Sequence, residues 1–303
     1  MNQGMKRLIT DGFLVIDKSA GMTSHDVVAI ARRALHTKKV GHAGTLDPMA
    51  TGVLVLGFGV GTRLLQYITG GSKSYDATAV LGASTVTDDL EGEVVTTASQ
   101  EELKSITDRA IEVELGRMRG TIMQRPSSVS AVKVGGERAY ARVRAGEEFE
   151  LPAREVTISQ LEILEIRRPH NEVRIEIDIQ VTCGSGTFIR AIARDCGKRL
   201  GVGGYLSVLR RTRVAPFDLS QAITVDALKS GEFEPLSVAD VAAMTFPCRQ
   251  VSLEERTELT FGRALTSNET PRITAALAGE DLLALLENRD GQARPIAVFA
   301  AKS

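Results

Sequence analysis

The sequence predicts an α+β fold with a small β-rich domain at its C-terminal end. Strand-like and helical segments are interspersed along the chain without the regular βαβ repeat of a parallel sheet. The chain has 303 residues, 43% of them hydrophobic, which is enough for one large domain and a second small one. Near the end, Asp290-Gly291 lies between two apolar runs and indicates a β-hairpin. We therefore expect a main domain over 1–245 and a small domain over 246–303.

The first eighty residues contain five expected elements. Continuous apolar runs and small-residue stretches indicate strands, and helical spacing behind a capping residue indicates helices. Asp26 is well placed in the first turn of the first helix. In order, these elements are a strand over 12–17, a helix that Ser24 caps and that runs to His36, a strand over 53–56, a helix over 62–68 and a strand over 75–81.

The later elements follow from the same signals. Residues 99–115 have a helix-start pattern and rough helical spacing, and 120–146 have loop character. The alternation over 173–181 predicts a half-buried strand. The remaining expectations are a helix over 187–200 closed by Gly201, a strand over 206–214, a helical acidic connector over 218–245 and a hairpin formed by 282–286 and 296–299.

Composition excludes several classes of protein. No apolar run approaches the roughly 18 residues that a membrane span needs, and the first ten residues lack a signal-peptide core. We therefore expect a cytoplasmic protein. The three cysteines, Cys183, Cys196 and Cys248, lack the paired spacing of a zinc site, so we expect reduced thiols and no metal. The absence of any nucleotide or metal motif predicts that no cofactor is bound.

The basic residues are unevenly distributed although the net charge is −1. The windows 27–46, 116–144 and 187–213 together hold 18 of the 37 lysines and arginines, whereas acids dominate at Asp88-Asp89-Leu90-Glu91. If the windows converge on one face, they form a binding surface for phosphates. Alternatively, each window is a solvated face with compensating acids nearby. Composition leaves both interpretations open.

The segment from Gly41 to Gly52 places one carboxylate, Asp47, among glycines, a histidine and a proline. Pro48 disfavours helical geometry at Asp47, and the glycines permit tight backbone paths and the close approach of another molecule. A carboxylate on such a loop can be presented to a ligand. An ordinary Asp-Pro turn is the alternative that spacing alone favours.

The complete string Gly-His-Ala-Gly-Thr-Leu-Asp-Pro-x-Ala-Thr-Gly-Val-Leu resembles the catalytic motif of the TruB family, the bacterial tRNA pseudouridine-55 synthases. The resemblance implies that Asp47 is catalytic and that uridine 55 of the tRNA T-loop is isomerised without a guide RNA. It also implies the pseudouridine synthase fold, a bent, largely antiparallel sheet flanked by helices. The C-terminal segment weakly resembles a PUA-like RNA-binding domain. The partner implied is the tRNA T-arm. We also expect a monomer without an obligatory protein partner.

Four further segments extend the resemblance from about residue 12 to 215. They run from Leu14 to Ser24, over Lys73-Ser74-Tyr75, over a thumb-like RNA-binding insertion at about 118–150, and from Cys183 through Leu209-Arg210-Arg211. The resemblance implies that Tyr75 stacks on the target base and acts in removing the C5 proton, and that Arg190 is the ionic partner of Asp47. A guanidinium beside a carboxylate favours the charged form of the acid.

The remaining site residues have milder implied roles. Leu209 completes an apolar floor, and Phe188 packs under the base. Lys18 supports the active-site loop or is a surface lysine. His42 contacts RNA where the target nucleotide leaves the stack, or is an ordinary loop histidine. Cys183 could suggest a thiol nucleophile, but no motif places a histidine to activate it, so we expect a structural role.

The chain departs from the family pattern at three places. Ser19 replaces a usual proline, Phe188 replaces the commoner tyrosine, and Ser127-Ser128-Val129 alters the usual thumb sequence after Pro126. Two alternatives stay open. The altered thumb and Phe188 leave room for a tRNA-binding or folding chaperone whose catalysis is secondary or lost. The RNA-guided synthase of archaea and eukaryotes shares the central motifs, but the thumb-like insertion argues against it.

Overall fold

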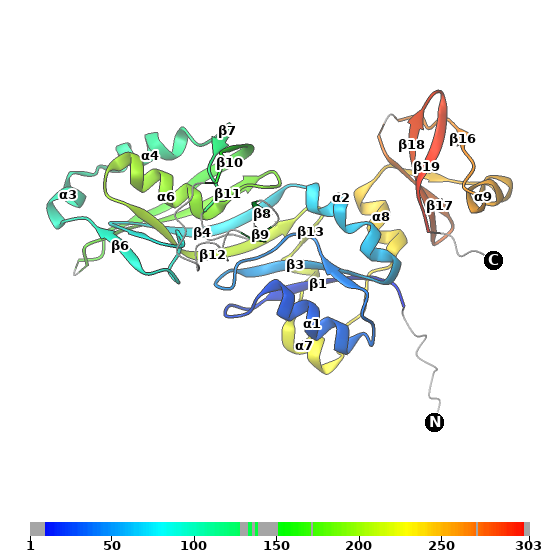
Figure 1. The fold of residues 1–303 in the computed structure, drawn as a ribbon, viewed down its shortest axis with the longest axis horizontal. Helices are drawn as coiled ribbons and strands as arrows, with labels where there is room; N and C mark the ends of the chain where they lie inside the picture. Colours follow the sequence, from blue (N-terminus) through cyan, green and yellow to red (C-terminus); the bar gives the residue numbers. More distant parts are fainter. Residues whose placement is uncertain are drawn as a thin grey trace.

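The computed structural model describes residues 10–127, 133–134, 137–138, 151–170, 172–270 and 272–299. Over these residues the chain forms an α+β fold with a large central sheet and a smaller C-terminal sheet, as predicted (Figure 1). Most of the expected thumb-like segment at about 118–150 lies outside the described residues.

The central sheet has ten strands in the order β14-β1-β3-β12-β4-β11-β10-β7, with β2 paired to β3 and β13 paired to β12. Its strands are β1 (Gly12–Lys18), β2 (Val40–His42), β3 (Thr51–Phe58), β4 (Lys73–Leu81), β7 (Gly120–Gln124), β10 (Arg154–Arg167), β11 (Ile175–Cys183), β12 (Gly204–Val214), β13 (Phe217–Asp218) and β14 (Ile223–Thr224). Two small hairpins are separate two-stranded sheets, β5 (Ala83–Thr85) with β6 (Val94–Thr97), and β8 (Lys133–Val134) with β9 (Glu137–Arg138).

Most neighbours in the central sheet are antiparallel, and the two exceptions are the β1–β14 and β3–β12 pairs. The short parallel pairing of β3 with β12 joins only Arg210 to Thr51 and Arg211 to Gly52. It connects the half of the sheet that contains β1 and β3 to the half that runs from β12 to β7. The loop that carries Asp47 enters β3 at this junction.

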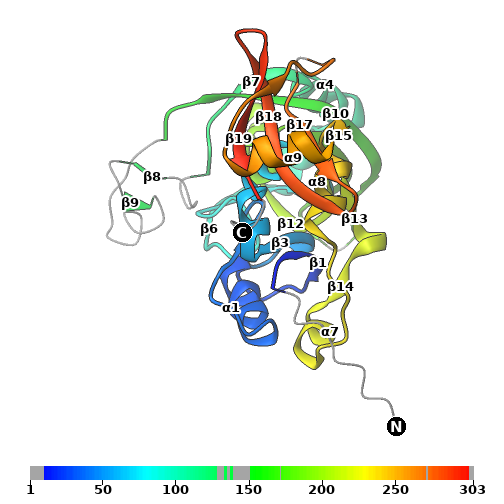
Figure 2. The ribbon, with the colours of Figure 1, turned by 90° about the vertical axis from the view of Figure 1, so that its right-hand side faces the viewer.

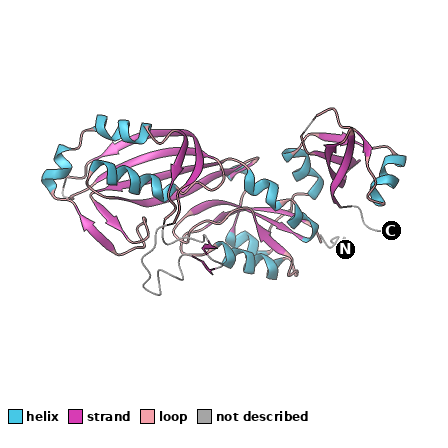
Figure 3. Cartoon of the chain, turned by 45° about the horizontal axis from the view of Figure 1, so that its top comes forward, coloured by secondary structure: helices cyan, strands magenta, loops and turns pink. Residues whose placement is uncertain are grey.

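Helices cover the sheet from outside, as Figure 3 shows. The helix α6 packs on β12, with α4 beside it, while α1 and α7 pack together next to β1 (Figure 1). The helices are α1 (Ser24–Ala34), α2 (Leu65–Gly70), α3 (Gln100–Ser105), α4 (Asp108–Gly116), α6 (Ile189–Leu200), α7 (Val225–Ser230), α8 (Val238–Thr245) and α9 (Leu253–Thr260), with short 3-10 helices at Gly59–Arg63 and Leu219–Gln221.

The start of the first helix corrects a prediction. Thr23, not Ser24, is the N-cap of α1, and it forms a capping box with Asp26. Ser24 is instead buried and bonds to the backbone of Leu46. The helix ends at Ala34 rather than at His36. The helix expected over 62–68 is a 3-10 turn over Gly59–Arg63 followed by α2.

Three other expectations need correction. The stretch 99–115 is two helices, because the backbone at Ile106 is extended and Thr107 caps a new helix. The stretch 218–245 is not simply a helical connector, since Ile223–Thr224 adds a strand to the central sheet beside β1. The 14-residue strand β10 was not predicted; bulges in its pairing with β11 interrupt its alternation.

The C-terminal residues form a five-stranded sheet in the order β15-β17-β18-β19-β16, which faces the viewer in Figure 2. Its strands are β15 (Cys248–Gln250), β16 (Leu265–Thr266), β17 (Thr274–Ala278), β18 (Asp281–Arg289) and β19 (Gln292–Val298). The predicted hairpin is β18–β19, and Asp290 and Gly291 have φ values of 54° and 72° in its turn.

Two apolar cores lie on opposite faces of the central sheet. One is formed by α1, α6 and the inward side chains of β4, β11 and β12. The other joins Phe13 and Val53 of the central sheet to α8 and to Ala275 and Leu285 of the C-terminal sheet. The two sheets therefore share a buried core through α8. Across the residues that the structure describes, no helix is long and apolar enough to cross a membrane.

Candidate active site

Residues 43–50 connect β2 to β3 and present Asp47 at the surface of a pocket. A tight turn forms where the Ala50 N–H donates to the Asp47 carbonyl at 3.1 Å. Leu46 and Met49 on either side are buried and anchor the loop in the core. The Asp47 side chain is one-third exposed, at 33%, so its carboxylate remains accessible. The segment is thus a turn, as spacing alone favoured, and it also displays a carboxylate.

The buried polar side chains of Arg211, Ser24 and Lys18 hold the backbone of this loop. The guanidinium of Arg211 donates to the carbonyls of Gly44 at 3.1 Å and Thr45 at 3.3 Å, and its Nε donates to Val53 at 2.7 Å. Ser24 both accepts from the Leu46 N–H at 2.8 Å and donates to the Leu46 carbonyl at 3.2 Å. Buried polar groups need such partners, so each of these contacts also restrains the loop.

Lys18 supports the same loop from β1. Its ammonium donates to the carbonyls of Met22 at 2.7 Å, Ser19 at 3.0 Å and Pro48 at 3.2 Å. The side chain is fully buried, so the interpretation as a surface lysine is wrong. Burial lowers the pKa of Lys18 to about 8, although Asp47 acts in the opposite direction. Lys18 lies behind the loop and does not line the pocket.

Gly52 permits the loop to enter β3 next to β12. Its φ is +100°, and a Cβ built on it would lie 2.1 Å from the carbonyl oxygen of Arg211. Only glycine fits this left-handed conformation and this close backbone approach. The requirement for glycine here therefore comes from the strand pairing that also brings Arg211 to the loop.

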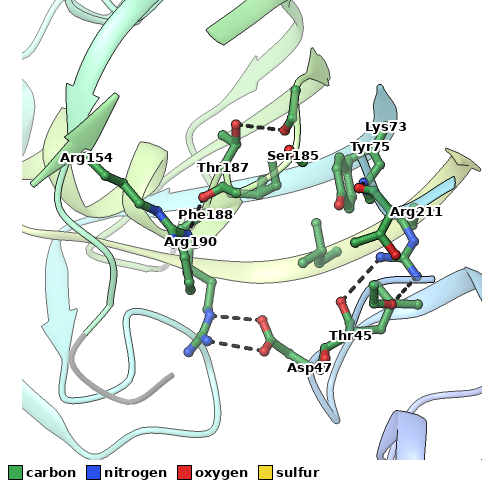
Figure 4. A pocket seen from close by; sticks show the side chains of 17 residues that line it. Thr45, Asp47, Lys73, Tyr75, Arg154, Ser185, Thr187, Phe188, Arg190 and Arg211 are labelled. Atoms are coloured by element: carbon green, nitrogen blue, oxygen red, sulfur yellow. Dashed lines mark hydrogen bonds and ion pairs between the residues drawn. The ribbon is translucent and has the colours of Figure 1, made fainter. Parts of the chain in front are cut away.

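Arg190, in the first turn of α6, is the ionic partner of Asp47 that the sequence led us to expect. Its Nε lies 3.0 Å from Asp47 Oδ2 and its Nη2 lies 3.2 Å from Oδ1, which is a bidentate arrangement (Figure 4). On its other edge, Nη1 donates to Asp89 Oδ2 at 3.0 Å and to the Thr87 carbonyl at 2.7 Å. The Arg190 guanidinium is therefore oriented from two sides while it faces Asp47.

The acidic run at residues 88–91 contributes to the wall behind Arg190. Asp88 accepts from Arg194 at 2.9 Å, just as Asp89 accepts from Arg190, and both acids are buried. Burial raises the pKa of Asp88, while Arg194 acts in the opposite direction. These acids were expected only as part of a generally acidic region. Their role as partners of arginines on α6 was missed.

Four of the seven basic residues in the third window, 187–213, have partners within the fold. Arg190 and Arg194 pair with the acids just described, and Arg210 pairs with Asp17 at 2.8 Å. Arg211 is buried against backbone carbonyls. Arg190, Arg194 and Arg210 thus have compensating acids, whereas Arg211 is satisfied by carbonyls, and these four residues do not form an open phosphate-binding surface.

The pocket next to Asp47 has a volume of about 290 Å³. It brings together five of the predicted residues, and Figure 4 shows Tyr75 and Arg211 on one side with Phe188 and Arg154 on the other. The predicted residues in its lining are Asp47, Tyr75, Phe188, Arg190 and Leu209. Arg211, Lys73 and Arg154 also line it and were not predicted as site residues.

Tyr75 and Leu209 form an apolar wall from the neighbouring strands β4 and β12. Both are buried, Tyr75 at 7% exposed and Leu209 at 5%, and both belong to the core beneath the pocket. Tyr75 therefore belongs both to the core and to the lining of the pocket. Burial raises the pKa of the Tyr75 hydroxyl, although the charge of Arg211 acts in the opposite direction. The phenol is therefore protonated at neutral pH.

Phe188 is held from two neighbouring strands. Gln124, buried on β7, donates to the Phe188 carbonyl at 3.0 Å and accepts from its N–H at 2.8 Å. Arg154, at the start of β10, places its guanidinium 4.8 Å from the centre of the Phe188 ring. The ring is therefore a fixed surface of the pocket.

His42 ends β2 and is the one remaining predicted site residue outside the pocket lining. Its imidazole is half-buried and makes an edge-to-face contact with His25, with ring centres 5.5 Å apart. Burial, followed by the charges of His25 and Arg211, lowers the pKa of His42. The ring is thus neutral at neutral pH.

Cys183 is buried at the end of β11, and burial raises the pKa of its thiol. This is the opposite of what a nucleophilic cysteine needs. The three cysteines are free. In the described ranges of the chain, no group of three or more histidine, cysteine or acidic side chains could hold a metal ion.

Comparison with protein families gives three consecutive matches. Residues 32–189 match the model described as "TruB family pseudouridylate synthase (N terminal domain)". Residues 190–234 match "tRNA pseudouridylate synthase B C-terminal domain", and 246–300 match "tRNA Pseudouridine synthase II, C terminal".

Two relatives that match along almost the whole chain carry the same name. A protein of Corynebacterium diphtheriae called tRNA pseudouridine synthase B is 48% identical over 295 residues, which cover 97% of each chain. One of the same name from Arthrobacter is 49% identical over 299 residues, covering 95% of this chain and 96% of the relative.

Among solved structures, the protein resembles chains from two complexes. One is an H/ACA RNP bound to a substrate RNA containing 2′-deoxyuridine, with a TM-score of 0.70 and 22% identity, covering 99% of this chain and 88% of that chain. The other is a Cbf5-Nop10-Gar1 complex, with a TM-score of 0.71, 23% identity and the same coverage. At these identities the likeness concerns the fold.

Proposed function

Because the chain belongs to the TruB family of pseudouridylate synthases, we propose that its Asp47 pocket isomerises uridine 55 of the tRNA T-loop to pseudouridine. The protein is an isomerase that acts on tRNA. The observation that carries the site assignment is the accessible Asp47 carboxylate, paired with Arg190 in a pocket walled by Tyr75, Phe188 and Leu209.

The reaction breaks the bond between N1 of uracil and C1′ of the ribose, turns the base and joins C5 to C1′. The proton on C5 is lost, and N1 gains one, so the conversion is a balanced isomerisation. Asp47 acts on the sugar as the base leaves, either by attacking C1′ or by assisting departure of the base. The bidentate Arg190 contact orients the Asp47 carboxylate, which both routes use.

The target nucleotide must leave the helical stack to reach Asp47. Base flipping costs a few kcal/mol, and stacking on aromatic rings returns on the order of 1–3 kcal/mol per base. Tyr75 and Phe188 come from different parts of the pocket wall and offer two ring surfaces. We assign them to holding uracil, and Leu209 to the floor beneath it. The half-buried His42 is assigned to RNA contact outside the pocket.

The raised pKa of Tyr75 bears on the removal of the C5 proton. A protonated phenol stacks well but accepts a proton only if it passes its own proton on. We therefore assign Tyr75 mainly to stacking and Asp47 to the covalent chemistry. Lys18, behind the loop, is a positioning residue.

We propose that the enzyme is a monomer that acts on the T-arm without a guide RNA, a protein partner or a cofactor, and that it works in the cytoplasm, where tRNA is its substrate. Residues 1–245 are proposed as the catalytic domain, with RNA contacts from the thumb-like insertion at about 118–150. The sheet within 246–303 is proposed as a PUA-like domain.

The test is turnover of a minimal T-stem-loop transcript labelled with tritium at C5 of uridine, with no guide RNA added. Wild type should release tritium and form pseudouridine at position 55. Asp47→Ala and Asp47→Asn should release none while binding the same RNA with largely unchanged affinity. Asp226→Asn, on the exposed first turn of α7, is the matched control and should retain full turnover.

Substantial turnover by either Asp47 variant would remove Asp47 from the chemistry. Tight T-arm binding by wild type without any pseudouridine would favour the chaperone interpretation. Turnover that requires an added guide RNA would favour the RNA-guided class instead.

A further inference from the structure

Arg154 is the first residue of β10 and lines the pocket opposite Tyr75 and Arg211 (Figure 4). Its backbone pairs with that of Gln124 on β7, the residue that holds Phe188. Its guanidinium lies over the Phe188 ring, and Nη2 donates to the carbonyl of Gly186. Arg154 therefore contacts the aromatic surface of the pocket directly.

Among the residues that the structure describes, Arg154 has fewer partners than the other two arginines of the pocket. Arg190 pairs with two carboxylates, and Arg211 donates to three carbonyls. In the part of the chain that the structure describes, no carboxylate lies within ion-pair distance of Arg154, and its buried Nε has no hydrogen-bond partner. Burial alone lowers its pKa. A guanidinium has five N–H donors, and most of these remain available.

An available guanidinium in a pocket wall fits an anionic ligand. Its planar fork matches the oxygens of a phosphate, which accept two parallel hydrogen bonds. An RNA substrate brings a phosphate on each side of every nucleotide, and a nucleotide whose base rests on Phe188 brings its own phosphates to the rim of this pocket.

We propose that Arg154 binds a phosphate adjacent to the target uridine and thereby holds Phe188 against the base. This rests on the proposed function, because it takes the flipped nucleotide as the ligand. Gln124 fixes the Phe188 backbone, whereas Arg154 touches the Phe188 ring. Arg154 is thus a substrate-binding residue that links contact with the RNA backbone to the position of the stacking surface.

The test removes single phosphate charges from the RNA. T-stem-loops are made with one methylphosphonate linkage each, at every position of the loop, with a 2′-O-methyl group on the preceding nucleoside. Each is compared with an RNA that has the same 2′-O-methyl group and an ordinary phosphate. Affinities are measured for wild type, Arg154→Met, Arg154→Lys and the control Arg109→Met, whose residue is exposed on α4.

Wild type and Arg109→Met should lose affinity by about tenfold at one linkage flanking the target uridine. Arg154→Met should bind the ordinary RNA about tenfold more weakly and show no further loss at that linkage. Its log–log salt slope should be smaller by about 1, and Arg154→Lys should recover part of both effects because it keeps the charge. A urea unfolding midpoint close to that of wild type verifies that the Met variant is folded.

Two results would overturn the proposal. One is a wild-type profile without loss at either flanking linkage, which does not depend on any variant. The other is an Arg154→Met variant that keeps the full loss there. Tritium release by wild type on the ordinary T-stem-loop distinguishes failure of the Arg154 proposal from failure of the proposed function. If wild type releases tritium but loses no affinity at either flanking linkage, only the role of Arg154 is rejected. If wild type releases no tritium, the proposed function is rejected.

Discussion

Asp89 Oδ2 lies 3.0 Å from Arg190 Nη1, and this ion pair is almost completely buried, with 6% of the Arg190 side chain and 4% of the Asp89 side chain exposed. The opposite edge of the same guanidinium faces Asp47. Asp89 therefore orients the Arg190 guanidinium toward the Asp47 carboxylate, although Asp89 does not line the pocket.

Replacing Asp89 with asparagine should lower kcat about 10- to 100-fold with a smaller change in KM. The amide keeps the shape but removes the charge that orients the buried Arg190, and the loss is felt when Asp47 acts. Steady-state tritium release measures both constants. Asp88→Asn is the neighbouring control, because Asp88 pairs with Arg194 rather than with Arg190. Equal loss of kcat in both variants would show a general effect on the wall.

Lys18 should make the stability of the protein depend on pH. Its pKa is about 8 in the fold, against 10.5 for the ordinary group. Below pH 8 the lysine is charged in both states and its burial cost is present in full. Between about 8 and 10.5 only the unfolded chain retains the proton, so the contribution of Lys18 to the free energy of unfolding rises with pH.

Urea unfolding of wild type and Lys18→Met at pH 7.5 and pH 10 measures this contribution. The difference in free energy of unfolding should move in favour of wild type by roughly 2 kcal/mol between the two pH values. Lys229→Met, at an exposed site on α7, should show no such movement. A difference that stays constant would mean that the ammonium is not the buried titrating group.

Gly52→Ala should destabilise the fold by more than about 2 kcal/mol, because the new methyl group would collide with the Arg211 carbonyl at a positive φ. Gly116→Ala tests the same substitution in α4, where nothing lies within 4 Å of the new Cβ. That control should be neutral or stabilising by up to about 1 kcal/mol. Equal unfolding midpoints for both variants would contradict the close pairing of β3 with β12.

Binding of the T-arm should weaken steeply as salt is raised, since each phosphate contact releases a counterion with a log–log slope of about −0.7 to −0.9. Arg210→Gln should leave the slope unchanged, because Asp17 already neutralises that arginine within the protein. Filter binding at several potassium chloride concentrations measures the slope. A flat dependence would count against an interface dominated by phosphates.

Local sequence patterns predicted much of the fold. The alternation in β11, the glycine that closes α6 and the Asp290-Gly291 turn each depend on a few neighbouring residues. The predictions that were wrong or missing involve distant contacts or irregular strands. The bulges of β10 interrupt its alternation of buried and exposed residues. Ser24 is of a residue type that commonly caps helices, but it bonds to Leu46, 22 residues away.

The residues of the site also fall into those that the sequence predicted and those that it did not. Asp47, Tyr75, Phe188, Arg190 and Leu209 were found through motif resemblance, and the fold brings them to one pocket. Asp89 was missed because its partner lies 101 residues further along the chain, and nothing in an acidic run identifies which base it meets. Arg154 lies in none of the motifs that carry the family resemblance. Only the structure shows that it lines the pocket without a carboxylate partner among the described residues.

The supports of the Asp47 loop bind main-chain atoms. Lys18, Ser24 and Arg211 contact carbonyls and one amide, and none of these contacts involves a loop side chain. An amino-acid change at exposed Thr45 leaves every one of these bonds in place, whereas Gly52 admits no larger residue. The polar supports therefore position the Asp47 carboxylate through the path of the main chain, independently of the side chain at the exposed position 45.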